Sequence, residues 1–150
     1  MILYRLTRKI YARDLSGIGA KTYGGRWNNK GNAMLYLASS RSLAVLEILV
    51  HLQPSIIPDD YCMVTIEAPD DIDTVDERIL PKNWQGLPAA NKVKQIGDKF
   101  LRESSKLLLK VPSSIIKEEF NYLANPAHAM ASKLKVIQVD PFSFDSRLLN

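Results

Sequence analysis

The sequence predicts a single α+β domain, and three observations support this class. The chain has 150 residues, which is long enough for one domain to bury a substantial core. Hydrophobic residues make up 46% of it and charged residues 24%, as in ordinary globular proteins. Strand-like and helix-like segments alternate irregularly, without a repeat and without the strand–helix–strand rhythm of a parallel sheet. We therefore expect one compact domain over residues 1–150.

The first third of the chain predicts two strands and one helix. The opening "MILYRLT" has the side-chain alternation of a strand. The next segment, "SGIGAKTYGGRWNNKGN", is rich in Gly and Asn, which favour turns, so a loop is expected there. The short apolar run "AMLYLAS" is typical of a buried strand. A helix is then expected from about Arg41 to Leu52, with Ser39 or Ser40 as its cap.

The remainder of the chain predicts further strands around a second helix. Strand composition is found in "YCMVTIEAP", "LLLKVPSSII" and "KLKVIQVDPFSF". An irregular connection is expected at "DDIDTVDERILPKNWQGLP", and a turn at the Asn-Pro step of "KEEFNYLANPAHAMAS". The helix is expected within "ANKVKQIGDKFLRESSKLLL", whose apolar side chains recur at helical spacing. Its expected core side chains are Val93, Ile96, Phe100 and Leu101.

Cysteine usage and the distribution of apolar residues favour a cytoplasmic protein. The only cysteine is Cys62, so no internal disulfide can form, which agrees with a reducing compartment. Three basic residues stand within the first nine, where a secretion signal would need an apolar stretch. No apolar run approaches the ~20 residues that a membrane helix needs. We expect a cytoplasmic location and no membrane partner.

Positive charge is concentrated near the start of the chain. The formal net charge is +4, and seven Lys or Arg residues within the first thirty are opposed only by Asp14. Residues 59–77 are acidic instead. This basic region favours an anionic partner, whether a nucleotide, a nucleic acid or an acidic protein segment. Motifs that interleave aromatic and basic residues for nucleic-acid binding are absent.

The first candidate site residue is Arg26, in the glycine-rich "GGRWNNKG". Glycine lets the backbone approach a ligand closely, and a guanidinium there suits two-pronged binding of a phosphate or carboxylate. The segment lacks the spacing of a P-loop, and an exposed arginine on a turn is the simpler interpretation of this motif alone. Tyr36 follows in the expected buried strand, where a tyrosine is more often part of the core than of a ligand site.

Glu47 is the second candidate, because it is a lone acid in an apolar helical run. One turn away in either direction lie Leu43, Ala44, Val50 and His51, and three of these four are apolar. A charge against a core costs free energy unless it has a partner or a function. A pair with His51, or a helix-edge acid that reaches solvent, would explain it structurally. A site carboxylate is the interpretation that we favour.

The region after the second helix supplies hydroxyl and amide candidates. Ser113 and Ser114 follow a proline at the end of an apolar run, where a capping or turn role is the simplest interpretation. Asn121, Asn125 and His128 lie near the second turn. The two histidines and the cysteine do not have the spacing of metal ligands, so no metal site is expected.

Two stretches together resemble proteins of the RES-domain family, which is named for an arginine, a glutamate and a serine. They are "GGRWNNKGNAMLYLASSRSLAVLEILVHL" and "VPSSIIKEEFNYLANPAHAMASKLKVIQVDPFSFDSRLL". The family arginine falls on Arg26, the tyrosine on Tyr36, the glutamate on Glu47 and the serine on Ser113, with Ser114 as the alternative. The family's Asn-Pro-x-His segment falls on Asn125, Pro126 and His128, and its terminal Asp-x-Arg, interpreted as structural, on Asp145 and Arg147.

The resemblance implies a toxin with a fold like that of ADP-ribosyltransferases and an activity that consumes NAD as its substrate, without a metal. It implies that Glu47 stabilises positive charge on the ribose and that Arg26 binds phosphate, with Arg5 as a second candidate for that contact. Tyr36, Ser113 and Asn125 would then contact the dinucleotide. The implied partner is a helix-turn-helix antitoxin of the Xre class, through which any contact with DNA would be indirect.

Two other functions stay open at this stage. One is a ribonuclease-type toxin that uses the basic N-terminal region. The other is an inactive module that only binds an antitoxin. For an NAD-consuming enzyme, the acceptor could be water, phosphate or a protein side chain, and the oligomeric state is equally open.

Overall fold

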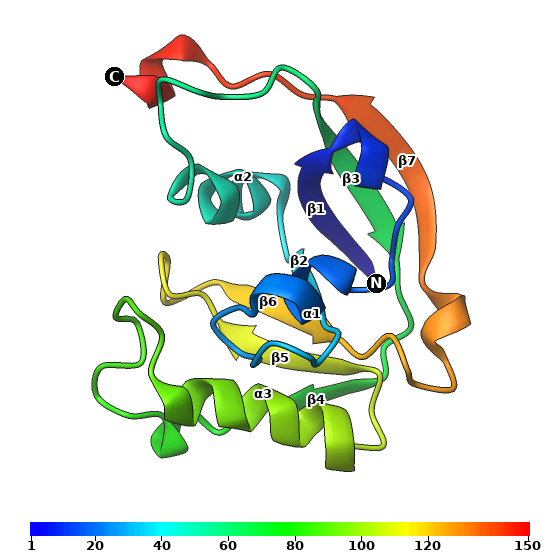
Figure 1. The fold of residues 1–150 in the computed structure, drawn as a ribbon. Helices are drawn as coiled ribbons and strands as arrows, with labels where there is room; N and C mark the ends of the chain where they lie inside the picture. Colours follow the sequence, from blue (N-terminus) through cyan, green and yellow to red (C-terminus); the bar gives the residue numbers. More distant parts are fainter.

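The protein folds around one seven-stranded mixed sheet, described here from a computed structural model that covers residues 1–150. The strand order is β4-β5-β6-β2-β1-β3-β7, and every neighbouring pair is antiparallel except β4–β5 (Figure 1). The strands are β1 (Ile2–Arg8), β2 (Leu35–Ala38), β3 (Tyr61–Glu67), β4 (Ile72–Thr74), β5 (Leu108–Pro112), β6 (Phe120–Ala124) and β7 (Lys135–Pro141). The helices are α1 (Ile18–Tyr23), α2 (Arg41–Leu49) and α3 (Asn91–Glu103), with four short 3-10 turns at Lys9–Tyr11, Glu77–Ile79, Ala131–Lys133 and Ser146–Leu149.

Most of the expected elements are present, and the α+β class is confirmed. Ser40, rather than Ser39, caps α2, because its hydroxyl accepts the backbone N–H of Leu43 at 3.1 Å. The helix ends at Leu49, three residues before the expected Leu52. None of the helices has the length and apolar composition that a membrane-spanning helix requires.

Two expectations about loops are wrong, and the expected Asn-Pro turn forms but follows a strand that the sequence did not indicate. The glycine-rich segment contains α1, whose six residues are too few for a helical period to be visible in the sequence. The irregular connection contains β4, a three-residue edge strand that pairs in parallel with β5. The turn at the Asn-Pro step is confirmed, and the residues before it form the unexpected strand β6, which pairs with both β2 and β5. Its asparagine Asn121, with Asn125 just beyond its end, gives the segment a turn-like composition although the strand is central.

The sheet is weakly joined at its middle, between β1 and β2. These two strands share one residue pair, Tyr4 with Ala38, whereas β1 pairs with β3 along its whole length. The sheet therefore consists of two parts, β4-β5-β6-β2 and β1-β3-β7, which diverge from one another on either side of this junction (Figure 1).

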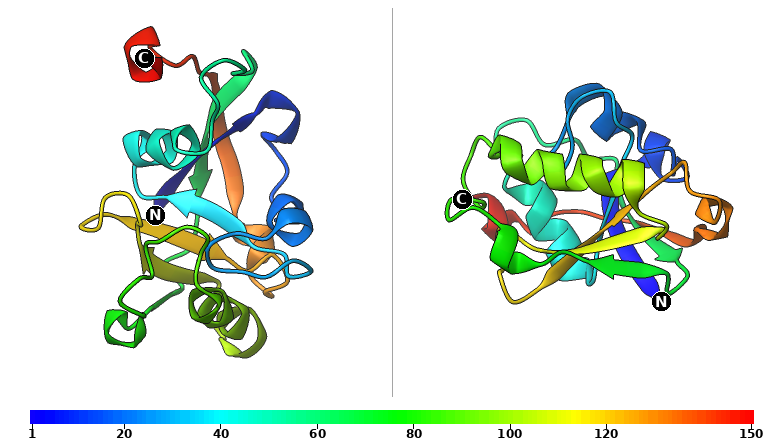
Figure 2. Two further views of the ribbon diagram at one scale, coloured as in Figure 1. Left: turned by 60° about the vertical axis from the view of Figure 1, so that its left-hand side comes forward. Right: turned by 90° about the horizontal axis from the view of Figure 1, so that it is seen from below.

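Two helices cover one face of the sheet and leave a space between them. Side chains of β2 alternate between the two faces, so Tyr36 and Ala38 face the helices while Leu35 and Leu37 face the opposite side. Helix α3 packs over the β4–β5–β6 part, as Figure 2 shows, and α2 packs over the β1–β2 junction. The cluster under α3 contains Trp27, Met34, Val75, Val93, Phe100, Leu109, Val111 and Leu123. The cluster under α2 contains Leu6, Ala38, Leu43, Ala44 and Met63.

Candidate active site

A cleft of about 830 Å³ lies on the helix-covered face, between the two clusters and against the β1–β2 junction. This volume is within the range of about 300–1,000 Å³ that is usual for small-molecule and cofactor sites. Its lining brings together residues from segments that are far apart in the sequence. They include Tyr4 and Arg5 of β1, Tyr36 of β2, Glu47 of α2, Asn121 of β6, and Arg26 and Ser114 of loops.

The Glu47 carboxylate has two protein partners in this cleft. Its Oε1 accepts the hydroxyl of Ser113 at 2.8 Å and the side-chain amide of Asn121 at 2.6 Å. Hydrogen bonds of this kind to an ionised group are stronger than neutral ones, and they compensate for placing a charge among apolar side chains. The pair with His51 does not form: His51 lines the cleft one turn further along without bonding to Glu47.

Ser113 lies behind Glu47, not in the cleft. The residue is fully buried, and its oxygen accepts the backbone N–H groups of Ile115 and Ile116, both at 3.1 Å. With its proton donated to Glu47, the hydroxyl has all its hydrogen-bonding capacity in use. The neighbouring Ser114 lines the cleft instead. Of the two serines, Ser114 is therefore the one that a ligand can touch, and Ser113 acts through Glu47.

Arg26 connects the glycine-rich loop to the segment before α3. Its Nη1 donates to the backbone carbonyls of Trp84 at 2.8 Å and Gly86 at 2.9 Å. Neither Nε nor Nη2 has a protein partner, so both can donate to an anion in the cleft. Burial lowers the pKa of Arg26, and the nearby charge of Glu47 opposes that shift, so the guanidinium stays charged near neutral pH.

Tyr36 holds the Arg26 loop by its hydroxyl while its ring lines the cleft. The hydroxyl donates to Oδ1 of Asn28 at 2.6 Å and accepts the backbone N–H of Trp27 at 3.1 Å. Burial raises the pKa of this phenol. The approach is close enough that a Cβ on Gly25 would lie 2.5 Å from the hydroxyl oxygen, so this position requires glycine.

Helix α3 also holds the Arg26 loop, through two residues that the sequence did not single out. The Asp98 carboxylate accepts the backbone N–H of Asn29 at 3.1 Å, the side-chain amide of Asn29 at 2.7 Å and that of Asn32 at 2.8 Å. A Cβ on the adjacent Gly97 would lie 1.7 Å from the carbonyl oxygen of Trp27. The available signal was a Gly-Asp pair two residues before Phe100, on the face of an amphipathic helix that should be apolar.

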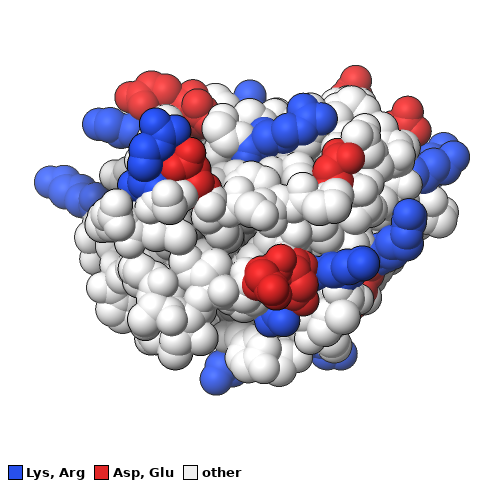
Figure 3. All heavy atoms as spheres, turned by 90° about the horizontal axis from the view of Figure 1, so that it is seen from above, with Lys and Arg blue, Asp and Glu red and all other residues white.

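Arg5 lies in the cleft wall on β1. Its Nη1 donates to the carbonyl oxygen of Asp14 at 2.7 Å and, more weakly, to that of Tyr11 at 3.4 Å. Burial lowers its pKa, and the charge of Asp14 opposes the shift. With Arg26 and Lys94 it makes the cleft positive around the single acid Glu47. On the face that Figure 3 shows, Lys and Arg are interspersed with Asp and Glu.

The structure does not bring Asn125 to the cleft. Its side-chain oxygen accepts the N–H of Ala127 at 3.0 Å, and its amide donates to the carbonyl of Leu101 at 3.3 Å, so it fastens the turn after β6 to the end of α3. His128 also acts in this turn. Its Nδ1 accepts the N–H of Met130 at 3.0 Å, and its Nε2 lies 2.7 Å from the carbonyl oxygen of Ser105.

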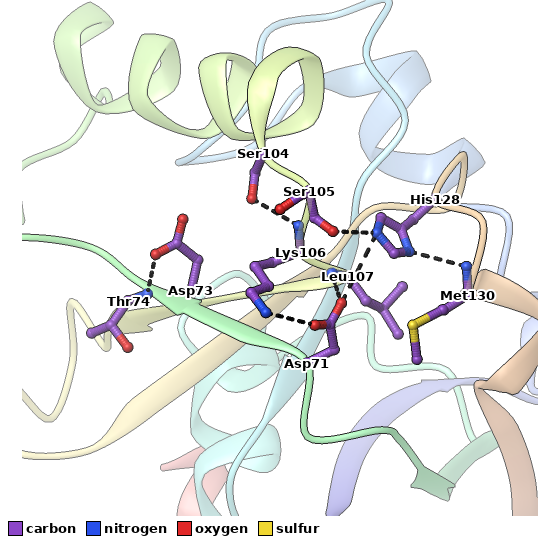
Figure 4. Close-up of polar contacts among 9 residues, drawn as sticks. All are labelled: Asp71, Asp73, Thr74, Ser104, Ser105, Lys106, Leu107, His128 and Met130. Carbon is purple, nitrogen blue, oxygen red and sulfur yellow. Dashed lines mark hydrogen bonds and ion pairs between the residues drawn. The ribbon is translucent and has the colours of Figure 1, made fainter.

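An acidic side chain completes this second network. Asp71 accepts the N–H of Leu107 at 2.9 Å and pairs with Lys106 at 3.0 Å, and its side chain and that of His128 point toward one another (Figure 4). The hydrogen bond from Leu107 and then that from Lys106 lower the pKa of Asp71. The Asn-Pro-x-His segment is thus structural here, because its contacts tie β4, β5 and the turn after β6 together.

At the end of the chain, Asp145 caps the last 3-10 turn. Its Oδ1 accepts the N–H of Arg147 at 2.9 Å, and the two side chains form an ion pair at 2.8 Å. This pair lies outside the cleft lining, in keeping with the structural role expected from the sequence.

The structure combines an α+β domain with an arginine and a glutamate that line one cleft and a serine that bonds to the glutamate. These are the three residue types after which the RES-domain family is named. The RES domain family matches residues 2–145, and the chain belongs to this family. The family resemblance seen in the sequence is thereby confirmed.

Similar proteins are spread over several bacteria. "Toxin Res" of Yersinia enterocolitica is 43% identical over 151 residues, covering 99% of both chains. "Prs ADP-ribosylating toxin" of Sphingobium sp. (strain YBL2) is 40% identical over 146 residues, covering 95% of this chain and 91% of its own. A solved structure, that of the M. tuberculosis MbcT–MbcA toxin–antitoxin complex, has a similar fold, with a TM-score of 0.75 at 20% identity over 99% of this chain and 86% of that one.

Proposed function

We propose that this protein is a toxin that cleaves the nicotinamide–ribose bond of NAD. The observation that carries the proposal is the state of Glu47: one carboxylate oxygen is held by two protein donors, and the other has no protein partner in a positively lined cleft of dinucleotide size. A fixed, partly desolvated carboxylate is suited to a reaction in which positive charge develops on a sugar.

The residues in the cleft fit the groups of NAD. As the glycosidic bond breaks, its electron pair passes to the nicotinamide nitrogen and the ribose becomes oxocarbenium-like. Glu47 would stabilise this cation, and Arg26 would bind the diphosphate through Nε and Nη2. Arg5 supplies a second positive charge, and the ring of Tyr36 an apolar surface for the nicotinamide. An acceptor oxygen from water, phosphate or a protein side chain would then bond to the ribose carbon and lose its proton.

The relatives support the same proposal. One is named an ADP-ribosylating toxin, and ADP-ribosylation consumes NAD by breaking this bond. Others are named toxins, and the structural neighbour was solved with an antitoxin. We therefore propose that an antitoxin neutralises this chain, and that it is a helix-turn-helix protein of the Xre class.

The test measures nicotinamide release from NAD by the purified protein. Glu47→Gln and Arg26→Ala should each reduce the rate on the order of 10²–10³-fold, because each removes a preorganised charge. Glu103→Gln and Arg102→Ala are matched controls, since both residues are exposed on α3 and pair with one another, Glu103 also with Lys99. They should retain the wild-type rate.

Other outcomes would favour the other two functions. Loss of RNA with NAD intact, and binding that weakens steeply with salt, would indicate a ribonuclease-type toxin. A protein that binds an antitoxin but releases no nicotinamide with water, phosphate or protein as acceptor would be an inactive binding module. Equal rates for the wild type and Glu47→Gln would count against the proposed role of the carboxylate.

A further inference from the structure

We infer that Asn121 is a positioning residue for Glu47, which selects the carboxylate oxygen that faces the reacting sugar. This inference rests on the proposed function, since it assigns a role within the same reaction. It concerns a residue outside the arginine–glutamate–serine set, located on β6, 74 residues from Glu47.

Both donors converge on the same oxygen. Asn121 and Ser113 each bond to Oε1 of Glu47, at 2.6 Å and 2.8 Å, while Oε2 accepts no hydrogen bond from the protein. The one fully buried side-chain polar atom without a hydrogen-bond partner is the hydroxyl of Thr65, so the unpartnered Oε2 is not fully buried. It therefore remains accessible from the cleft, which Glu47 lines. The two oxygens of the carboxylate are thus inequivalent before any ligand arrives.

The two donors act from different directions and on rigid supports. Ser113 is fully buried, and the two backbone N–H groups that its oxygen accepts fix the direction in which its own proton points. Asn121 belongs to a strand with neighbours on both sides, pairing with Ala38 of β2 and Val111 of β5. Its side chain lines the cleft, so it restrains Glu47 from the ligand side while Ser113 restrains it from the interior.

This arrangement has a kinetic consequence. A carboxylate that is free to rotate presents either oxygen to the ribose at varying distances. A carboxylate bonded at Oε1 holds Oε2 in one position while positive charge develops on the ribose. Only interactions that are stronger in the transition state than in the ground state raise kcat. Loss of Asn121 should therefore lower kcat more than it raises KM for NAD.

The first variant is Asn121→Ala, tested in the full-length protein with NAD as substrate. We expect kcat to fall on the order of 10- to 100-fold, the usual range for one hydrogen bond to a charged group, with KM changed by less than about threefold. The affinity for ADP-ribose should stay near the wild-type value, and the variant should remain folded at the assay temperature. Asn91→Ala is the matched control, because Asn91 is exposed at the start of α3 and its side chain makes no hydrogen bond. It should retain the wild-type kcat.

The second variant is Asn121→Asp, which preserves shape and removes the donor at neutral pH. It places a carboxylate against Oε1, so kcat should fall at pH 7. At lower pH the pair shares a proton, which can restore a hydrogen bond to Glu47. The activity of this variant relative to the wild type should therefore rise as pH decreases from 7 to 5. Because a pair of carboxylates also destabilises the fold as pH rises, the thermal midpoint is measured at both pH values, and the kcat ratio should change by more than the folded fraction does.

The outcomes separate the inference from the proposed function. If the wild type releases no nicotinamide, both fall together. If the wild type is active and Asn121→Ala has the same kcat, the inference alone is overturned. It is equally overturned if Asn121→Ala loses activity in proportion to a lower thermal midpoint, or if the Asn121→Asp to wild-type ratio does not change with pH.

Discussion

The sequence indicated that Glu47 has a partner or a function, but it did not indicate which residues bond to it. A lone acid among Leu, Val and Ile indicated that the position has a partner or a function, and the structure supplies the partners. The nearest candidate in sequence was His51, which forms no bond with it. Ser113 and Asn121, the actual partners, are 66 and 74 residues away. Strand pairing sets this proximity, and no local pattern encodes it.

The hydroxyl of Tyr36 provides a test at the same scale. Tyr36→Phe keeps the ring in the cleft and leaves Oδ1 of Asn28 and the N–H of Trp27 without their partner. We expect the free energy of unfolding to fall by about 1–3 kcal/mol, measured by urea denaturation, because these groups are buried. The KM for NAD should rise as the Arg26 loop loosens.

Tyr11→Phe serves as the control for this variant. Tyr11 is exposed and its hydroxyl bonds to nothing, so its removal should leave both the unfolding free energy and KM unchanged. An unchanged stability in Tyr36→Phe would contradict the anchoring role of the hydroxyl.

Among the elements, α3 is the one whose contribution exceeds what its sequence predicts. Its amphipathic pattern correctly indicated a helix with Val93 and Phe100 in the core. The pattern could not indicate that Gly97 and Asp98 face the loop of residues 26–32. That contact depends on the path of a loop 66 to 69 residues earlier in the chain, and a glycine is equally compatible with a solvent-facing position.

Gly97→Ala tests the contact between α3 and the Arg26 loop. Alanine normally favours a helix over glycine by about 1 kcal/mol. Here the added methyl would lie 1.7 Å from the carbonyl oxygen of Trp27, so backbone must move. We expect a net loss of about 1–3 kcal/mol in unfolding free energy, typical of overpacking, together with slower nicotinamide release.

Gly19→Ala is the corresponding control in α1. Nothing lies within 4 Å of the Cβ that it would add, so helix propensity should dominate. Gly19 lines the cleft, so this control concerns stability alone, and a gain of about 0.5–1 kcal/mol in unfolding free energy is expected. Equal effects of the two substitutions in urea denaturation would show that the close approach at Gly97 is not maintained.

At the scale of the whole molecule, the class of fold was predictable and the location of the cleft was not. Apolar runs such as "AMLYLAS" and "YCMVTIEAP" marked their strands because a buried strand has few alternatives to that composition. The order of the strands, and the single pair Tyr4–Ala38 that divides the sheet, depend on contacts between distant segments. The family resemblance, rather than periodicity, indicated that Arg26 and Glu47 would share a site.

Because the cleft is lined from both parts of the sheet, a bound dinucleotide should stabilise the molecule as a whole. Glu47→Gln, which should bind NAD but cleave it on the order of 10²–10³-fold more slowly, allows this measurement. At a concentration 100 times the Kd, binding contributes about 2.7 kcal/mol, which corresponds to a Tm increase of roughly 5–10 °C for a chain of this size.

Arg26→Ala in the same background should abolish most of this increase, and adenosine, which lacks the diphosphate, should produce little of it. A Tm that does not respond to NAD at any concentration would contradict the assignment of the cleft to a dinucleotide.

The cluster under α2 and the cluster under α3 stabilise the fold, and the candidate site residues are separate from both. Glu47, Arg26 and Asn121 lie between the clusters and belong to neither. Mutations at these positions can therefore abolish activity without unfolding the protein. An inactive copy would keep its native surface and would compete with an active copy for any macromolecule that binds that surface.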